Sequence, residues 1–244
     1  MLKLITFDYW NTIFDSSNGI ERNKVRKQAL IDQLDEYSIP PQKIDEMIVE
    51  IGEFFNKMWV QQQKTPNSLD MIKHIWSINK LPENPDKQRY LQKIFEEVVL
   101  LYPPKLNPNA REVIAKLEEK YILGIVSDAG FSPGTILRSL LNTESILHYF
   151  SYFSFSDELN IAKPNIQMFN NILDKAKVKP QEALHIGDIE RTDIVGAKAN
   201  GMRAIKYSGD DASQIYNNKS SETAADFVSN DWNEIYDWII NNED

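Results

Sequence analysis

The segment LITFDYWNTIF, residues 4–14, contains the pattern from which the fold and the chemistry of this chain can be inferred. It begins with a largely apolar run of the length of a buried strand, and the run ends at Asp8. Asn11 and Thr12 follow at the spacing of a turn. A carboxylate at the end of a buried strand is suited to be a nucleophile or a metal ligand. Trp10 stands two residues after Asp8, where a second acid would be useful for such chemistry.

The composition limits the classes of protein to which the chain can belong. Its 244 residues, 42% of them hydrophobic, are enough for one large domain or two unequal ones. A net charge of -9 argues against a nucleic-acid partner, which requires a basic face. Cysteine is absent, which excludes disulfides and thiolate chemistry and favours a cytoplasmic protein. We find no signal-peptide pattern and no apolar run near the roughly 20 residues of a spanning helix, so no membrane partner is expected.

Residues 18–102 have the pattern of a helical block without a convincing strand. Apolar residues recur in it at helical spacing, as Val25, Ala29 and Leu30 do in its first part. Pro40 and Pro41 end the first helix and begin the second, and Asn67 or Ser68 can cap the third. The expected helices are 20–37, 41–60, one that begins at 67 or 68, and 86–101, which together suggest a small bundle.

The remainder of the chain alternates short apolar strands with helices, which predicts an α/β fold with a Rossmann-like, doubly wound parallel sheet. The helical block separates the first strand from the rest, so we expect a core of residues 1–17 and 103–244 with a helical cap, 18–102, inserted after the first strand. The expected crossings lie near 15–19 and 102–107, and 209–222 is expected to be a polar loop. The expected strands are 2–7, 121–126, 152–155, 183–186, 203–207 and 226–228, and the expected helices are 110–120, 136–141, 166–175 and 192–200.

Polar side chains follow four of the predicted strands. In open α/β sheets, ligands bind beyond the carboxyl ends of the strands, so these side chains are expected to meet at one edge. Together they are the groups required to bind a divalent cation and a phosphate. They are Asp8, Ser127, Asp128, Lys163, Asp188 and Asp193.

Each of these groups has a chemical task in such a site. Mg²⁺ prefers carboxylate and carbonyl oxygens, which Asp8, Asp188 and the backbone carbonyl of Trp10 can supply. Carboxylates at close range repel one another strongly without a cation. Lys163 can offset negative charge, and Ser127 with backbone N–H groups near Trp10 can hold phosphate oxygens. Asp8 can then attack phosphorus to form an aspartyl-phosphate that water hydrolyses.

With these residues in place, the chain resembles the haloacid dehalogenase-like hydrolase superfamily across essentially its whole length. The family's DxDxT motif corresponds to residues 8–12, its hydroxyl residue to Ser127 and its lysine to Lys163-Pro164. The GDxxxxD motif corresponds to Gly187, Asp188 and Asp193. The resemblance implies an inserted helical cap and Asp8 as the nucleophile. It implies Mg²⁺ at Asp8, the Trp10 carbonyl and Asp188, with Asp193 supporting the metal shell or Lys163, and a substrate held by Asn11, Thr12, Ser127 and Lys163.

Trp10 departs from the family pattern, because phosphatases of the family usually have an aspartate there that protonates the leaving alcohol. An indole N–H cannot shuttle protons, so slow turnover of poor leaving groups is expected. Family dehalogenases commonly have a tyrosine at this position, but they work without metal and lack the Gly-Asp pair that is intact here. We therefore expect a hydrolase, a Mg²⁺-dependent phosphatase of a small phosphorylated metabolite, as a monomer or weak homodimer. The alternatives are a 2-haloacid dehalogenase and a catalytically weak relative that binds a phosphorylated ligand.

Several of these residues also have purely structural interpretations. Asp8, Ser127 or Asp128 could cap turns or helices, Lys163 could be a surface residue, and Trp10 could pack under the cap or stack on substrate. The three histidines, His74, His148 and His185, show no metal-ligand spacing. The basic cluster Arg22, Lys24, Arg26 and Lys27 is expected to be a solvated helix face rather than a substrate clamp. Phe54, Phe55, Trp59 and Trp76 are expected to form the core of the bundle.

Overall fold

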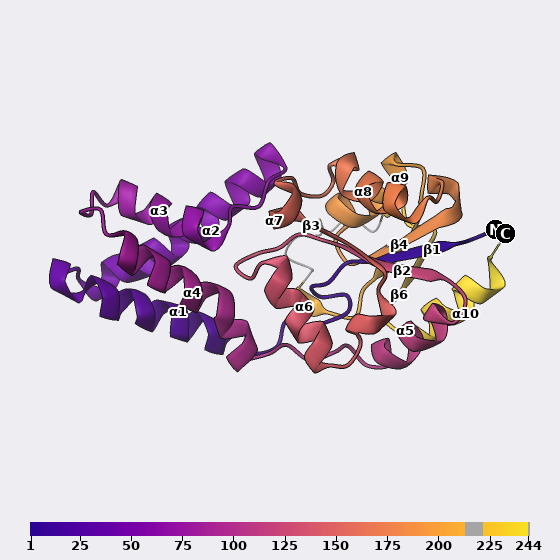
Figure 1. Cartoon of the computed structure of the whole chain (residues 1–244), viewed down its shortest axis with the longest axis horizontal. Helices are drawn as coiled ribbons and strands as arrows, with labels where there is room; N and C mark the ends of the chain where they lie inside the picture. The colour runs from indigo at the N-terminus through magenta and orange to yellow at the C-terminus, as the bar shows by residue number, and fades with distance from the viewer. Residues whose placement is uncertain (213–221, 244) are drawn as a thin grey trace.

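The computed structural model describes residues 1–212 and 222–243, and these contain a six-stranded parallel sheet with helices on both faces (Figure 1). The strand order β3-β2-β1-β4-β5-β6 is that of a doubly wound sheet, as predicted. Most of the predicted loop at 209–222 lies outside the described residues. The strands are β1 (Leu4–Phe7), β2 (Ile122–Ser127), β3 (Tyr152–Phe155), β4 (Ala183–Gly187), β5 (Arg203–Tyr207) and β6 (Phe227–Ser229).

The central strand β1 lies at the point where the strand order reverses, between β2 and β4. Phe7 pairs with Ile125 on one side and with Ile186 on the other. The carboxyl ends of the three strands are therefore level, and the residues that follow them emerge together. Since ligands of open α/β sheets bind at such a reversal, the register places Asp8, Ser127 and Asp188 where a site is expected.

Two apolar clusters hold the helices onto the sheet. One includes Phe7, Ile125 and Trp232, and the other includes Leu4, Val126 and Phe169. Figure 1 shows α8 and α9 on one side of the strands and α5, α6 and α10 on the other. These helices are α5 (Ala110–Glu118), α6 (Gly134–Thr143), α8 (Ile166–Ala176), α9 (Val195–Ala199) and α10 (Trp232–Asn241), and α7 (Ser156–Leu159) is a single turn after β3. Short 3₁₀ helices span Asp35–Tyr37, Leu147–Tyr149 and Pro180–Glu182, and a π-helical turn spans Glu190–Ile194.

Four further helices lie beside the sheet and form a block with its own apolar core (Figure 1). Asn67 caps the third of them through a capping box, accepting from the backbone N–H of Asp70 at 2.9 Å while Asp70 accepts from that of Asn67. Asn84 caps the fourth, which begins with a proline. No helix among the described residues combines the length and apolarity needed to cross a bilayer. The four are α1 (Gly19–Leu34), α2 (Pro41–Gln62), α3 (Ser68–Ile78) and α4 (Pro85–Leu101).

The expectation that the basic cluster of α1 is a solvated face is wrong for its two arginines, which are buried. Nη1 of Arg22 donates to the carbonyls of Ser17 and Tyr102, each at 2.9 Å, and so ties together the two segments that connect the block to the sheet. The guanidinium of Arg26 lies 4.1 Å from the ring centroid of Phe131. A planar guanidinium can be buried in this way because carbonyls and aromatic faces replace its water.

Candidate active site

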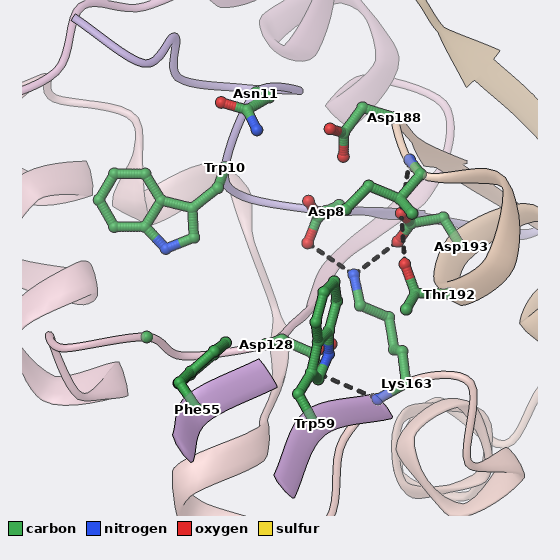
Figure 2. A pocket seen from close by; sticks show the side chains of 12 residues that line it. Asp8, Trp10, Asn11, Phe55, Trp59, Asp128, Lys163, Asp188, Thr192 and Asp193 are labelled. Atoms are coloured by element: carbon green, nitrogen blue, oxygen red, sulfur yellow. Dashed lines mark hydrogen bonds and ion pairs between the residues drawn. The ribbon is translucent and has the colours of Figure 1, made fainter. Parts of the chain in front are cut away.

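A cavity of about 190 Å³ lies at the carboxyl ends of β1 and β4 (Figure 2). Most of its wall comes from loops of the sheet, and part comes from α2 of the helical block. Four of the predicted carboxylates and the predicted lysine are in its wall, so the fold does bring them together. The lining residues are Asp8, Trp10, Asn11, Phe55, Trp59, Asp128, Gly130, Lys163, Asp188, Ile189, Thr192 and Asp193.

Lys163 connects two carboxylates at the centre of this site. Its Nζ lies 2.6 Å from Oδ1 of Asp8 and 2.6 Å from Oδ1 of Asp193 (Figure 2). The lysine side chain is only 2% exposed, so the structural interpretation as a surface residue is wrong. Burial alone would lower the pKa of Lys163, but attraction to the nearby carboxylates outweighs it and raises the pKa above its usual value. Lys163 is therefore a permanent ammonium ion in the site.

The backbone around Lys163 is fixed by contacts with two other parts of the chain. The backbone N–H of Lys163 donates to Oδ1 of Asp128 at 2.9 Å. The preceding N–H, of Ala162, donates to the carbonyl of Gln63 at the end of α2, at 2.6 Å. Because both bonds flank the lysine, the position of its side chain depends on the loop after β2 and on the helical block.

Asp193 is held by donors from its own loop and from β4. Its Oδ2 accepts from the backbone N–H of Ile189 at 2.9 Å and from Oγ1 of Thr192 at 3.2 Å. A side chain at Gly187 would not fit, since a Cβ there would lie 2.4 Å from Cγ of Asp193. Although burial opposes it, the charge of Lys163 and the hydrogen bond from His185 hold the pKa of Asp193 below its usual value. Asp193 is thus ionised and faces Lys163.

His185 is a site neighbour that the sequence interpretation missed. Its Nε2 lies 3.2 Å from Oδ1 of Asp193, and its Nδ1 lies 2.9 Å from Oγ1 of Thr6. The ring is fully buried, and burial lowers its pKa, so the imidazole is neutral. With Asp193 ionised, Nε2 must carry the proton and donate it, and Nδ1 accepts from the threonine. The alternation of β4 could have indicated this, because His185 is two residues before the Gly187 that packs on Asp193.

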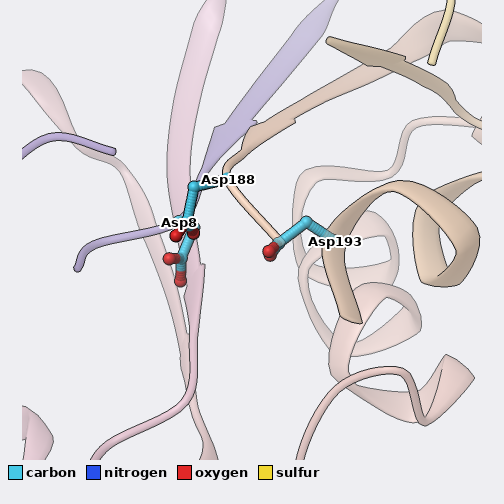
Figure 3. A group of neighbouring side chains, drawn as sticks. All are labelled: Asp8, Asp188 and Asp193. Carbon is cyan, nitrogen blue, oxygen red and sulfur yellow. The ribbon is translucent and has the colours of Figure 1, made fainter. Parts of the chain in front are cut away.

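Asp8, Asp188 and Asp193 offer carboxylate oxygens that all lie within 4.8 Å of one another (Figure 3). Burial, followed by repulsion from Asp8, raises the pKa of Asp188 well above its usual value. Burial also raises the pKa of Asp8, although Lys163 opposes it. The three clustered carboxylates face a single ammonium, which leaves an excess of negative charge. A hard divalent cation would neutralise that excess. Their oxygens are also the ligands that such a cation prefers, so the donor set fits Mg²⁺.

The expectation that the aromatic residues form the bundle core is wrong for Trp59, which projects from α2 into the cavity wall (Figure 2). Phe55 packs against the bundle core as expected, and it lines the cavity as well. Nε1 of Trp59 donates to Oδ2 of Asp128 at 2.8 Å. Asp128 does not cap a helix, since the next one begins at Gly134. Burial raises the pKa of Asp128 to about 6. Helical spacing shows which face of α2 is apolar, but it does not show that the last turns of α2 extend past the bundle. The expectation for Trp59 was wrong for that reason.

The remaining predicted residues are arranged around the same strand end. Trp10 is half-buried in the cavity wall, and the guanidinium of Arg22 lies 5.9 Å from its ring centroid. Asn11 also lines the cavity, with a left-handed backbone at φ 56°. Thr12 and Ser127 are fully buried and are not among the lining residues, although the Ser127 hydroxyl slightly opposes the rise that burial causes in the pKa of Asp8. Substrate contacts by Thr12 and Ser127 therefore stay predictions.

Comparisons with known proteins agree with this geometry. The model of the haloacid dehalogenase-like hydrolase family matches residues 2–201. The chain is 29% identical over 216 residues to a glyceraldehyde 3-phosphate phosphatase of Pyrococcus abyssi, which covers 85% of this chain and 82% of that protein. Among solved structures, a 2-haloacid dehalogenase from Pseudomonas syringae superposes with a TM-score of 0.70 at 20% identity over 99% of both chains. A HAD phosphatase from Thermococcus onnurineus superposes with a TM-score of 0.66 at 19% sequence identity over 98% of both chains. Structural similarity at such low sequence identity shows the fold alone.

Proposed function

Because this chain belongs to the haloacid dehalogenase-like hydrolases, we propose that it is a Mg²⁺-dependent phosphatase that acts on a small phosphorylated metabolite through an aspartyl-phosphate at Asp8. One observation carries the proposal: Lys163 bridges Asp8 and Asp193 at 2.6 Å each, inside a cluster that also contains Asp188. The cluster lies at the strand-order reversal, where ligands of such sheets bind. The relative named a glyceraldehyde 3-phosphate phosphatase supports a small phosphorylated substrate.

The metal would be held by carboxylates of Asp8 and Asp188 and by the backbone carbonyl of Trp10. Asp193 would support this shell while it holds Lys163. When bound, Mg²⁺ would neutralise charge between these carboxylates and the phosphoryl oxygens. That neutralisation is required because an anionic substrate would otherwise enter a cavity whose described wall contains four aspartates and one lysine.

The bond changes of the reaction can be assigned to Asp8 and to water. A carboxylate oxygen of Asp8 forms a bond to phosphorus while the bond between phosphorus and the leaving oxygen breaks. The leaving group departs with that electron pair. A water oxygen then bonds to phosphorus, the bond to Asp8 breaks, and inorganic phosphate is released with the Asp8 carboxylate restored. The ammonium of Lys163 balances the negative charge of Asp8 and of the phosphoryl oxygens during both steps.

Trp10 determines which leaving groups this chemistry suits. It occupies the position from which an acid would protonate the leaving oxygen, and its indole N–H cannot do so. Anions that are stable without a proton, such as phenoxides, are therefore expected to leave faster than alkoxides. A positioned acid typically contributes about 10²–10⁴-fold, which is the expected disadvantage for alkyl phosphates.

We further propose that residues 18–102 act as a cap that opens to admit substrate. In the structure the cap contacts the core through the bond from Trp59 to Asp128 and through the bond from Ala162 to Gln63. Both contacts flank Lys163, so closure of the cap would position the lysine at the same time as it excludes water. The two connecting segments near 15–19 and 102–107 are the expected hinges.

The proposal is tested by hydrolysis of p-nitrophenyl phosphate with Mg²⁺ and with a chelator. Its leaving group hardly needs an acid, so Trp10 should not mask activity. We expect turnover that requires Mg²⁺ and disappears in Asp8→Asn. A folded protein that binds Mg²⁺ and phosphate without any turnover would instead be the phospho-ligand-binding relative.

Metal binding is tested separately by thermal unfolding. Addition of Mg²⁺ is expected to raise the unfolding temperature, because a ligand at 100 times its dissociation constant stabilises by about 2.7 kcal/mol. The rise should be much smaller in Asp188→Asn. The matched control is Asp86→Asn, at a carboxylate of α4 whose side chain is 92% exposed, where the rise should be unchanged. If Mg²⁺ raised the unfolding temperature equally in Asp188→Asn and Asp86→Asn, the ion would bind at a site that does not include Asp188.

A second candidate, a 2-haloacid dehalogenase, is favoured by one observation, the aromatic ring of Trp10 in the cavity wall. A halide leaves without a proton, so this reaction would not need an acid there. The clustered carboxylates of Asp8 and Asp188 favour the metal-dependent reaction instead. Chloride release from 2-chloropropionate in the presence of chelator, with no hydrolysis of p-nitrophenyl phosphate, would establish the dehalogenase.

A further inference from the structure

We propose that the leaving group of the natural substrate is small, has a flat or apolar face, and carries no second negative charge. This inference rests on the proposed phosphatase function and specifies its substrate class. It follows from three properties of the cavity: the charges in its wall, the aromatic side chains opposite those charges, and its volume.

The charges in the wall are sufficient for one phosphoryl group and leave nothing for a further anion. Among the described residues that line the cavity, Lys163 is the only cation, and it already contacts Asp8 and Asp193. Two further carboxylates, of Asp128 and Asp188, line the same space. A carboxylate on the leaving group would lose its water without gaining a counter-charge and would face like charges, which is costly in a partly dry site.

Two arginines come close to the cavity, but each lies against an indole ring of its wall and does not itself line it. The guanidinium of Arg191 lies 4.5 Å from the ring centroid of Trp59, and that of Arg22 lies 5.9 Å from the ring centroid of Trp10. Neither arginine is among the lining residues. Arg22 is also engaged with the carbonyls of Ser17 and Tyr102. A substrate in the cavity therefore meets the indoles rather than the guanidinium groups.

The aromatic wall and the volume indicate the shape of the group that is accepted. Trp10, Phe55 and Trp59 supply aromatic surface on which a flat or apolar group can pack. The cavity has about 190 Å³, and an apolar cavity of about 150 Å³ holds one benzene molecule. A phosphoryl group together with a leaving group of about one ring or a short carbon chain matches this volume.

The experiment compares pairs of substrates in which one member carries an additional carboxylate. Glyceraldehyde 3-phosphate and 3-phosphoglycerate form one pair, and phenyl phosphate and 4-carboxyphenyl phosphate form the other. We expect kcat/KM to be at least about tenfold higher for the uncharged member of each pair, which is a difference of about 1.4 kcal/mol. The carboxylated phenol is the stronger acid and the better leaving group, so its slower turnover could not come from leaving-group chemistry.

Parallel assays with p-nitrophenyl phosphate separate the two levels of the proposal. No hydrolysis of p-nitrophenyl phosphate would mean that the phosphatase function itself is wrong. Normal hydrolysis of it, with equal or higher kcat/KM for the charged members of both pairs, would overturn only the inference about the leaving group.

A charge introduced into the wall tests the cause directly. Phe55→Arg should raise kcat/KM for 3-phosphoglycerate relative to glyceraldehyde 3-phosphate by about tenfold or more, because it supplies the missing counter-charge. Phe55→Leu is the uncharged variant at the same position, and Val60→Arg places the charge on the exposed side of the same helix, where Val60 is 53% exposed. Both should keep the wild-type preference. An equal change in Phe55→Leu would show that size, not charge, determines selectivity. Should Phe55→Arg fail to fold, the substrate pairs on the unmodified protein still decide.

Discussion

Nζ of Lys163 lies 2.6 Å from Oδ1 of Asp8, although the two residues are 155 positions apart and both side chains are almost completely buried. Removing two charges from water is costly, and it is tolerated only where the charges contact each other with good geometry. Here the contact places the proposed nucleophile beside a fixed ammonium. The same lysine also contacts Asp193, so the site stays anionic until a further cation enters.

Replacement of Lys163 by methionine should be damaging for both stability and activity. Its removal leaves buried carboxylates without their counter-charge, which typically costs about 3–5 kcal/mol in the free energy of unfolding. Loss of its charge near the phosphoryl oxygens should lower kcat on p-nitrophenyl phosphate by about 10²–10³-fold. Urea unfolding and steady-state kinetics measure the two effects.

The matched control for that variant is Lys3→Met. Lys3 makes an ion pair with Glu182, but its side chain is 56% exposed, and exposed pairs contribute at most about 1 kcal/mol. Activity of Lys3→Met should be unchanged. If Lys163→Met were as stable and as active as this control, the buried contact would have no role in the site.

Replacement of His185 should affect the reaction through Asp193. In His185→Leu, Oδ1 of Asp193 keeps Lys163 as a donor but loses the hydrogen bond from His185. A hydrogen bond to a charged group contributes about 1.5–3 kcal/mol, so the free energy of unfolding should fall by up to that amount. Because Asp193 positions Lys163, we expect kcat on p-nitrophenyl phosphate to fall with little change in KM. His185→Gln can donate to Asp193 and should recover part of the kcat. The control is His148→Leu, at an exposed histidine, which should change neither the free energy of unfolding nor kcat.

A kcat in His185→Gln as low as that in His185→Leu would argue against a positioning role. The fully buried ring would then matter only for packing in β4. Equal stability of His185→Leu and His148→Leu would go further and show that the hydrogen bond to Asp193 contributes nothing measurable.

Replacement of Trp10 by aspartate should restore an acid near the leaving oxygen. We expect hydrolysis of alkyl phosphates such as glycerol 3-phosphate to rise relative to that of p-nitrophenyl phosphate, by up to about 10²–10⁴-fold. Trp10→Asn has nearly the same shape without the titratable group and should give no such rise. No gain in a folded Trp10→Asp protein would mean that the tryptophan does more than occupy the place of an acid.

Asp128 should make the stability of the protein depend on pH in a defined window. Burial raises its pKa from 3.8 to about 6 in the folded protein. Between pH 3.8 and about pH 6, the folded protein therefore binds more protons than the unfolded chain does. The free energy of unfolding falls as the pH rises through this window. The full effect is at most about 3 kcal/mol, and it is smaller in practice because the carboxylate is still partly open to the cavity.

Urea unfolding at several pH values between about 4 and 7 measures this dependence. The fall in stability across the window should be smaller in Asp128→Asn than in the wild type. Asp86→Asn, at an exposed carboxylate, should keep the wild-type slope. Parallel slopes for the wild type and Asp128→Asn would show that Asp128 is ionised to the same extent in the folded and unfolded chains.

The type and order of the elements could be inferred from local patterns. Apolar runs that end in Asp8, Ser127 and Asp188 indicated buried parallel strands, and 3.6-residue spacing indicated the helices of the inserted block. The strands β2 and β4 form within one residue of their expected bounds, and β1 begins two residues later than expected. Such patterns succeed because burial on a strand or on one helix face requires apolar residues at fixed intervals.

Contacts between distant elements could not be inferred in the same way. His185 was interpreted as an ordinary strand residue, yet its ring reaches Asp193. Arg22 and Arg26 looked solvated because charge in a sequence does not reveal which carbonyls and rings will surround it. Trp59 was placed in the bundle core, and the cavity contact of Phe55 was missed, because periodicity says nothing about where a helix ends relative to another layer.

The sequence by itself determined the fold class and the set of groups at the sheet edge, since strand periodicity and the order of the motifs are local properties of the chain. Only the tertiary structure decided that Lys163 lies between Asp8 and Asp193, that His185 donates to the same carboxylate, and that aromatic residues of α2 close the cavity. These outcomes depend on strand order, register and the docking of one layer on another. They arise from the packing of the whole chain, and no local segment specifies them.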